Sequence, residues 1–290
     1  MVTELLFAPF VDYGFMRLGL VAALSVGATC GLLSGVLVVR GQSLLGDAIG
    51  HAVLLGVVVG HVVAGPLGVP VGAMLAALLM VTVTSVVSRH APLHRETSMG
   101  LVFAPMFALG LVLISMLRPR GIDLFHVLFG NVLGVSRTGA VMGLVVGVVV
   151  VGAVVLLLPA LTLWCFDPVG AEAAGLNVRR LEQAFFVMLA ATVVVALQTV
   201  GLILVVAMLI LPGATGRLLA TSFPMMLLLS ATTGVVSGTA GLLASFHLDV
   251  ASGPAIVLVC GLLCYVALLV AAVPPAFAAT RAAASTSSIS

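Results

Sequence analysis

An aspartate and a histidine four residues apart, Asp47 and His51, are the residues of this sequence best suited to bind a metal ion. Residues with this spacing lie on one face of an α-helix, with their side chains within reach of each other. A carboxylate oxygen and an imidazole nitrogen are good ligands for divalent manganese, iron or zinc. Gly46 and Gly50 leave room for a second chain or an ion to approach. The same spacing also suits a hydrogen bond that only stabilises packing, so two ligands alone do not define a site.

The other polar groups in apolar surroundings are weaker candidates. His247 and Asp249 fall between two late apolar segments, where they are candidates for the mouth of a pore. His61 is ten residues beyond His51 and therefore off its helical face, so we expect a packed or interfacial histidine. The remaining histidines fall in expected connecting segments: His90, His94 and His126.

The composition determines what kind of protein must position these residues. The chain has 290 residues, of which 62% are hydrophobic, and its 11 basic and 9 acidic residues make only 7%. A soluble domain carries about 25% charged residues, and the mean hydropathy here is +1.38. This composition excludes a soluble enzyme, a disordered chain and a nucleic-acid-binding protein. It predicts a protein that crosses a membrane several times.

The charged residues divide the sequence into apolar blocks, each long enough for the roughly 20 residues of a membrane-spanning helix. The continuous apolar character favours helices over a porin-type barrel, whose strands would alternate. Gln198, Thr199 and Gly201 could divide the block 183–216 into two helices. We therefore expect an all-α, polytopic membrane bundle with eight or nine transmembrane helices, one domain over residues 1–290 and a disordered tail at 279–290. The expected spans are 18–39, two within 48–88, 97–117, 138–166, one or two within 183–216, 218–246 and 250–280.

Glycines four residues apart predict close packing between these helices, because both members of a pair lie on one face. Such pairs are Gly46/Gly50, Gly56/Gly60, Gly143/Gly147 and Gly234/Gly238.

Arginines in short loops indicate the orientation of the chain in the membrane. Arg40, the loop 89–95 and the loop 165–181 all fall on one side, which we expect to be cytoplasmic. Arg217 joins them if the block 183–216 crosses twice. The arginines at 118, 120 and 137 fall on the opposite side, so the bias is moderate.

A short helix outside the bilayer is predicted at residues 167–175, within this arginine-rich side. Asp167 can cap its N-terminus, Pro168 suits the first helical position, and Gly175 suits its end. Such a helix can simply shape a loop, or it can dock a cytoplasmic partner.

The chain carries no nucleotide-binding motif. A GxxxxGK[ST] loop is impossible in a sequence without lysine, and no GxSxG nucleophile elbow is present. Transport energised by ATP would therefore need an ATPase on another subunit.

Four stretches, in order, resemble the permease subunits of ATP-binding-cassette (ABC) importers for manganese, zinc and iron. They are residues 35–54, 166–176, 200–219 and 245–253, and Leu128-Phe129-Gly130 adds a weaker fifth. The resemblance runs from about residue 15 to residue 268. This family usually has a proline where this chain has Leu55, and often has one where this chain has Ala251.

The resemblance implies that Asp47 and His51 lie in the metal path and that the 167–175 helix is the coupling helix that docks on the ATPase. It implies a homodimeric pathway, an ATPase dimer, an extracellular metal-binding lipoprotein or solute-binding protein, and a bacterial cytoplasmic membrane. The metal would be the transported ion rather than a resident cofactor, and the chain would not be an enzyme. The coupling-helix residues are Asp167, Pro168, Ala171, Glu172, Ala174 and Gly175.

Three other functions remain open at this point. A permease for metal chelates or cobalamin-like substrates would need a wider pore and no compact Asp–His pair. A stand-alone secondary metal transporter would need no partner and would use a proton gradient. An intramembrane hydrolase is disfavoured because no HExxH helix is present.

Overall fold

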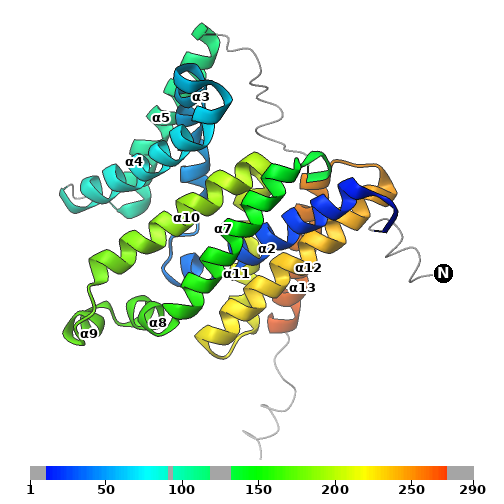
Figure 1. Ribbon diagram of the computed structural model, residues 1–290. Helices are drawn as coiled ribbons and strands as arrows, with labels where there is room; N and C mark the ends of the chain where they lie inside the picture. The colour runs from blue at the N-terminus through cyan, green and yellow to red at the C-terminus, as the bar shows by residue number, and fades with distance from the viewer. Residues whose placement is uncertain (1–10, 91–93, 118–131, 273–290) are drawn as a thin grey trace, which may run out of the picture.

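A computed structural model describes residues 11–90, 94–117 and 132–272, which form helices and no β-strand (Figure 1). The predicted all-α fold is confirmed. The long helices are α2 (Gly14–Val39), α3 (Leu45–Ala64), α4 (Gly68–His90), α5 (Arg95–Leu117), α7 (Arg137–Leu156), α10 (Val178–Val200), α11 (Leu202–Leu219), α12 (Phe223–Leu248) and α13 (Ser252–Ala272). Shorter helices are α8 (Leu158–Phe166) and α9 (Pro168–Ala173), with 3-10 turns at Gly65–Leu67 and Val132–Gly134.

Eight segments of the described chain are helical, long and apolar enough to cross a membrane. One of them, Leu45–Ser88, folds back at Gly65–Leu67 into the hairpin of α3 and α4, so counting its two arms separately gives nine. The block 183–216 divides at Gly201, whose φ of +86° is readily adopted only by glycine. The chain therefore crosses twice where the sequence left one or two spans open. The tail at 279–290 and His126 lie outside the described residues.

The span expected within residues 138–166 is present, but it is shorter than this block. The structure ends α7 at Leu156 and begins the separate helix α8 at Leu158. Pro159 has no backbone N–H to donate to the carbonyl of Val155, and it is instead placed in the first turn of α8. Within this block only α7 is long enough to span.

Helix α2 lies at the centre of a bundle formed with α7, α11, α12 and α13 (Figure 1). Helices α3, α4 and α5 pack on one another and form a second group beside this bundle. Helices α10 and α11 join the two groups, since each contacts α2 and α3. The start of α3 is therefore held against α11, which packs in turn on the central helix.

The predicted glycine pairs lie at helix crossings. An added Cβ on Gly27 of α2 would lie 2.5 Å from the carbonyl oxygen of Gly234 on α12. A Cβ on Gly56 of α3 would collide with the carbonyl oxygen of Gly72 on α4. Small residues let these backbones touch, as is typical of packing in membranes.

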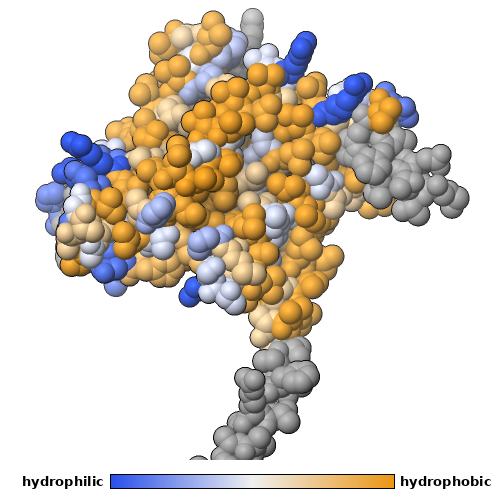
Figure 2. All heavy atoms as spheres, turned by 60° about the horizontal axis from the view of Figure 1, so that its bottom comes forward, coloured by the Kyte–Doolittle hydropathy of each residue, from blue (hydrophilic) through white to orange (hydrophobic). Residues whose placement is uncertain are grey.

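The face of the molecule seen in Figure 2 is largely apolar. Helices α5 and α13 are the least buried of the spans and expose large aliphatic side chains along much of their length. Such faces suit contact with lipid or with another membrane subunit. Exposed examples are Leu101, Leu109, Met116, Leu258, Leu262 and Leu269.

Candidate metal site and docking helix

The structure places Asp47 and His51 together, as the spacing predicts. Asp47 lies in the first turn of α3 and His51 one turn further along. Nδ1 of His51 is 3.1 Å from Oδ1 of Asp47 and 2.9 Å from the backbone carbonyl oxygen of Asp47. A carbonyl oxygen can only accept, so Nδ1 must carry the proton. In the neutral imidazole this leaves Nε2 with a free lone pair, which is the form that binds a metal.

Asp47 and His51 lie on the one stripe of α3, between Leu45 and Gly60, that is partly exposed. The side chains of His51 and Asp47 are 27% and 33% exposed. Leu55 and Val59 continue the stripe at four-residue spacing, while all other residues from Leu45 to Gly60 are buried. The carboxylate and the imidazole are thus accessible to an ion or to another subunit.

The flanking glycines serve a different purpose from the one expected. A Cβ on Gly46 or on Gly50 would collide with the side chain of Leu209 or Leu202 of α11, respectively. The room that these glycines leave is occupied by α11 of the same chain. They fix the position of α3 and so the position of Asp47 and His51.

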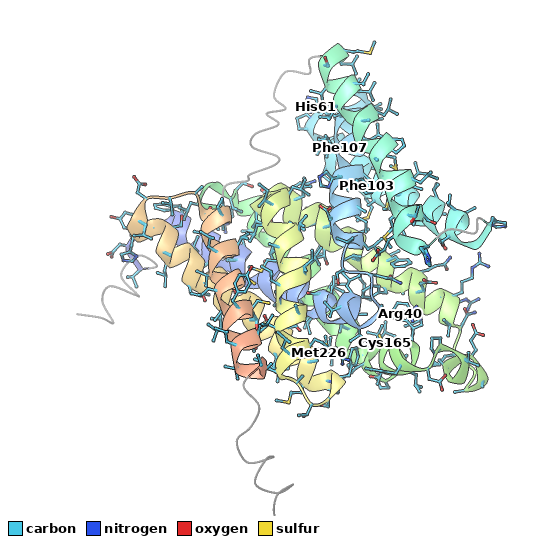
Figure 3. All side chains as sticks on the ribbon, turned by 180° about the vertical axis from the view of Figure 1, so that it is seen from behind. Arg40, His61, Phe103, Phe107, Cys165 and Met226 are labelled. Atoms are coloured by element: carbon cyan, nitrogen blue, oxygen red, sulfur yellow. The ribbon has the colours of Figure 1, made fainter. Side chains whose placement is uncertain are left out.

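Two phenylalanines of α5 enclose the imidazole of His51. The ring of Phe107 lies 4.9 Å away at 83°, and the ring of Phe103 lies 5.9 Å away. Figure 3 shows both side chains on α5, alongside α3. These rings restrict the rotamers of His51 and lower the local dielectric, which strengthens its contact with a charge. Sequence reasoning missed them, because two phenylalanines four residues apart on an apolar helix are an ordinary packing pattern.

Helix α9 is capped at both ends as predicted. The Asp167 carboxylate accepts a 2.8 Å hydrogen bond from the amide of Gly170. At the other end, the amide of Leu176 donates to the carbonyl of Ala171, and Gly175 adopts a φ of +84°. The paired bond from the amide of Gly175 to the carbonyl of Glu172 completes a Schellman motif.

Helix α9 is also prominently exposed. Within it only Ala171 is buried, and Val169 is 78% exposed. Phe166, just before the helix, is exposed as well. A rigid, apolar-tipped helix of this kind is a suitable contact for another protein.

Comparison with known proteins places the chain in a family. The sequence profile of the ABC 3 transport family matches residues 12–271. The chain belongs to this family. It is similar to the "Manganese transport system membrane protein MntC" of Halalkalibacterium halodurans, with 41% identity over 87% of this chain and 86% of the relative. It is also similar to the "Chelated iron transport system membrane protein YfeD" of Yersinia pestis, with 40% identity over 93% of this chain and 89% of the relative.

A solved structure has the same fold as this ABC 3 chain. "PsaBC from Streptococcus pneumoniae in complex with Fab" is 32% identical, with a TM-score of 0.82 over 92% of this chain and 95% of that one. The ABC 3 chain is thus a multi-pass membrane permease, a transport subunit of the cytoplasmic membrane. The resemblance inferred from the sequence motifs is confirmed.

Among its described residues, the ABC 3 permease has no group of three or more His, Cys, Asp or Glu side chains able to hold a metal. His247 is exposed in the last turn of α12, with Nδ1 2.9 Å from the carbonyl oxygen of Leu243. Asp249 follows as the left-handed C-cap, with a φ of +53°. Neither joins the Asp47–His51 pair, so their pore-mouth role stays a prediction.

A hollow of about 490 Å³ between α4 and α10 of the ABC 3 permease contains neither Asp47 nor His51. Its polar lining consists of Thr82, Ser85, His90, Arg179, Glu182 and Gln183.

Proposed function

We propose that this chain is the transmembrane subunit of an ABC importer for a divalent transition-metal ion, manganese or iron. The observation that carries the proposal is the accessible pair of Asp47 and His51, with Nε2 of the histidine free to coordinate. The relatives named for manganese and iron transport agree with these oxygen and nitrogen ligands. The metal is cargo here, held briefly and released.

The pathway forms between two copies of the chain. Each copy offers one carboxylate and one imidazole, which is too few to replace the hydration shell of a divalent ion. Two copies facing each other through the exposed stripe of α3 supply four ligands. Their two carboxylates also balance the double charge of the ion, which would otherwise be costly within the bilayer.

ATP binding and hydrolysis are coupled to transport through α9. The distribution of arginines supports a cytoplasmic position for α9, where an ATPase dimer can bind its exposed surface. An extracellular binding protein delivers the ion on the other side. ATP binding then rocks the helices and changes the side to which the Asp47–His51 pair is open.

The function is tested by ⁵⁴Mn uptake into liposomes that contain the chain with its cognate ATPase, in the presence of the cognate binding protein. We expect uptake that requires ATP, is competed by free Fe²⁺, and stops when the catalytic glutamate of the ATPase is replaced. Uptake by this chain alone under a proton gradient would instead establish a secondary transporter. Uptake only of chelated metal would support the chelate permease.

The docking role of α9 gives a separate prediction. Replacing Val169 by Asp puts an unpaired charge at the tip of the helix, and we expect ATPase retention on the purified chain to fall by about 10-fold or more. Co-purification of the two subunits and their joint ATP hydrolysis measure the effect. Val250→Asp, at an exposed valine between α12 and α13, is the matched control. Equal ATPase retention by the two variants would contradict the docking role.

A further inference from the structure

Arg40 connects the turn between α2 and α3 to α8, the helix that precedes α9. It is the C-cap of α2, and α3 with Asp47 begins just after the turn that follows. Its guanidinium carbon lies 4.4 Å from the centre of the Trp164 ring, and Nη1 donates a 3.2 Å hydrogen bond to the Trp164 carbonyl oxygen. Figure 3 shows Arg40 beside Cys165, the next residue of α8. Arg40 thus holds both the ring and the backbone of the same residue.

Trp164 is itself firmly held. It is 1% exposed, and its ring packs 5.6 Å from the ring of Phe185 of α10. It lies in the last turn of α8, and α9 begins only four residues later at Pro168. The guanidinium also complements the negative end of the α8 dipole. A displacement of α9 can therefore reach the partner of Arg40 through the short segment that joins α8 to α9.

The turn between Arg40 and α3 can transmit such a movement to α3. The amide of Gln42 donates to the carbonyl of Leu37 at 2.9 Å, and the amide of Leu45 donates to the carbonyl of Gln42 at 2.9 Å. These bonds tie the end of α2 to the start of α3. The short turn is thus rigid, and the first turn of α3, which carries Asp47, follows Arg40.

The turn between α2 and α3 also contains two polar atoms that make no hydrogen bond in this conformation. Within the described part of the chain, Nε of Arg40 and Oε1 of Gln42 are buried without a hydrogen-bond partner. One atom is a donor and the other an acceptor, and leaving both unpaired costs free energy. Each of the two atoms is therefore available for a hydrogen bond if α8 shifts.

We propose that Arg40 is a positioning residue that transmits movement of α9, through Trp164, to Asp47 and His51. The inference rests on the proposed ABC import function and identifies how the ATPase reaches the metal site within one chain. Arg40 neither binds the metal nor contacts the ATPase. Its loss uncouples the two sites while leaving each of them intact.

The experiment compares manganese imported per ATP hydrolysed by the complete transporter in liposomes. For Arg40→Gln we expect ATPase binding and ATP hydrolysis within about twofold of wild type and about 10-fold less manganese per ATP. Arg40→Lys keeps the charge but loses the planar fork, so an intermediate ratio is expected. Arg180→Gln, at an exposed arginine near the start of α10, is the matched control and should keep the wild-type ratio. A merely structural role would lower the amount of assembled transporter and not this ratio.

The pairing with Trp164 is tested separately. Trp164→Leu should lower the ratio as Arg40→Gln does, and the double variant should lose no more than either single one. Additive losses, or a wild-type ratio in Arg40→Gln, would overturn the proposal. If Arg40→Gln fails to assemble, Arg40→Lys and Trp164→Phe decide: reduced ratios support the linkage, and wild-type ratios refute it. A wild-type complex that imports no metal would instead refute the import function itself.

Discussion

Replacing Asp47 by Asn is expected to reduce ATP-driven manganese uptake on the order of 100-fold. In a homodimer the change removes both negative charges that offset the ion, while the isosteric side chain keeps the packing of α3. The Nδ1 of His51 keeps its bond to the Asp47 backbone carbonyl, which the substitution leaves in place. ATPase binding and ATP hydrolysis should persist, because the docking helix is untouched. Uptake of ⁵⁴Mn per milligram of assembled transporter measures the effect.

Replacing His51 by Ala should give a loss of similar size, because it removes two of the four proposed ligands. His61→Ala is the matched control, since His61 is a comparably half-buried histidine near the other end of α3. It should retain uptake near the wild-type rate. If both Asp47→Asn and His51→Ala imported manganese at the wild-type rate, the metal path would lie elsewhere.

The second large effect concerns the fold and is expected for Gly27→Leu. Gly27 lies where α2, the central helix, crosses α12, and even a Cβ there would lie 2.5 Å from the Gly234 carbonyl oxygen. A leucine must push the two helices apart, at a cost of about 3 kcal/mol or more. We expect a lower thermal unfolding midpoint in detergent and less folded protein.

The emission of Trp164, the chain's single tryptophan, can follow this unfolding. The control is Gly152→Leu on α7, where an added Cβ has nothing within 4 Å. That variant should unfold close to the wild-type temperature. Equal midpoints for the two variants would mean that α2 and α12 do not pack as closely as the structure has them.

Features set by neighbouring residues could be predicted from the sequence. The caps of α9 depend on Asp167 and Gly175, each within a few residues of the groups that it satisfies. The contact between Asp47 and His51 depends only on helical spacing. The apolar blocks predicted most spans, because length and charge suffice for that inference.

Features that depend on distant parts of the chain could not be predicted from the sequence. Phe107 reaches His51 only because α5 folds back onto α3, and the sequence gives no register for that packing. The contact of Arg40 with Trp164 joins residues 124 positions apart. The break at Leu157 lies inside an unbroken apolar block, where a helix can also continue past a proline with a kink.

The two-ligand pair on α3 has a genetic consequence. If each chain supplies half of a site that works only when complete, a defective copy disables the healthy copy with which it pairs. In a cell that makes equal amounts of normal and Asp47-substituted chains, random pairing leaves only about a quarter of the dimers with every ligand. Such alleles would be dominant, whereas alleles that prevent folding would be recessive. Whether an allele is dominant or recessive would thus distinguish substitutions that damage the metal site from substitutions that damage the fold.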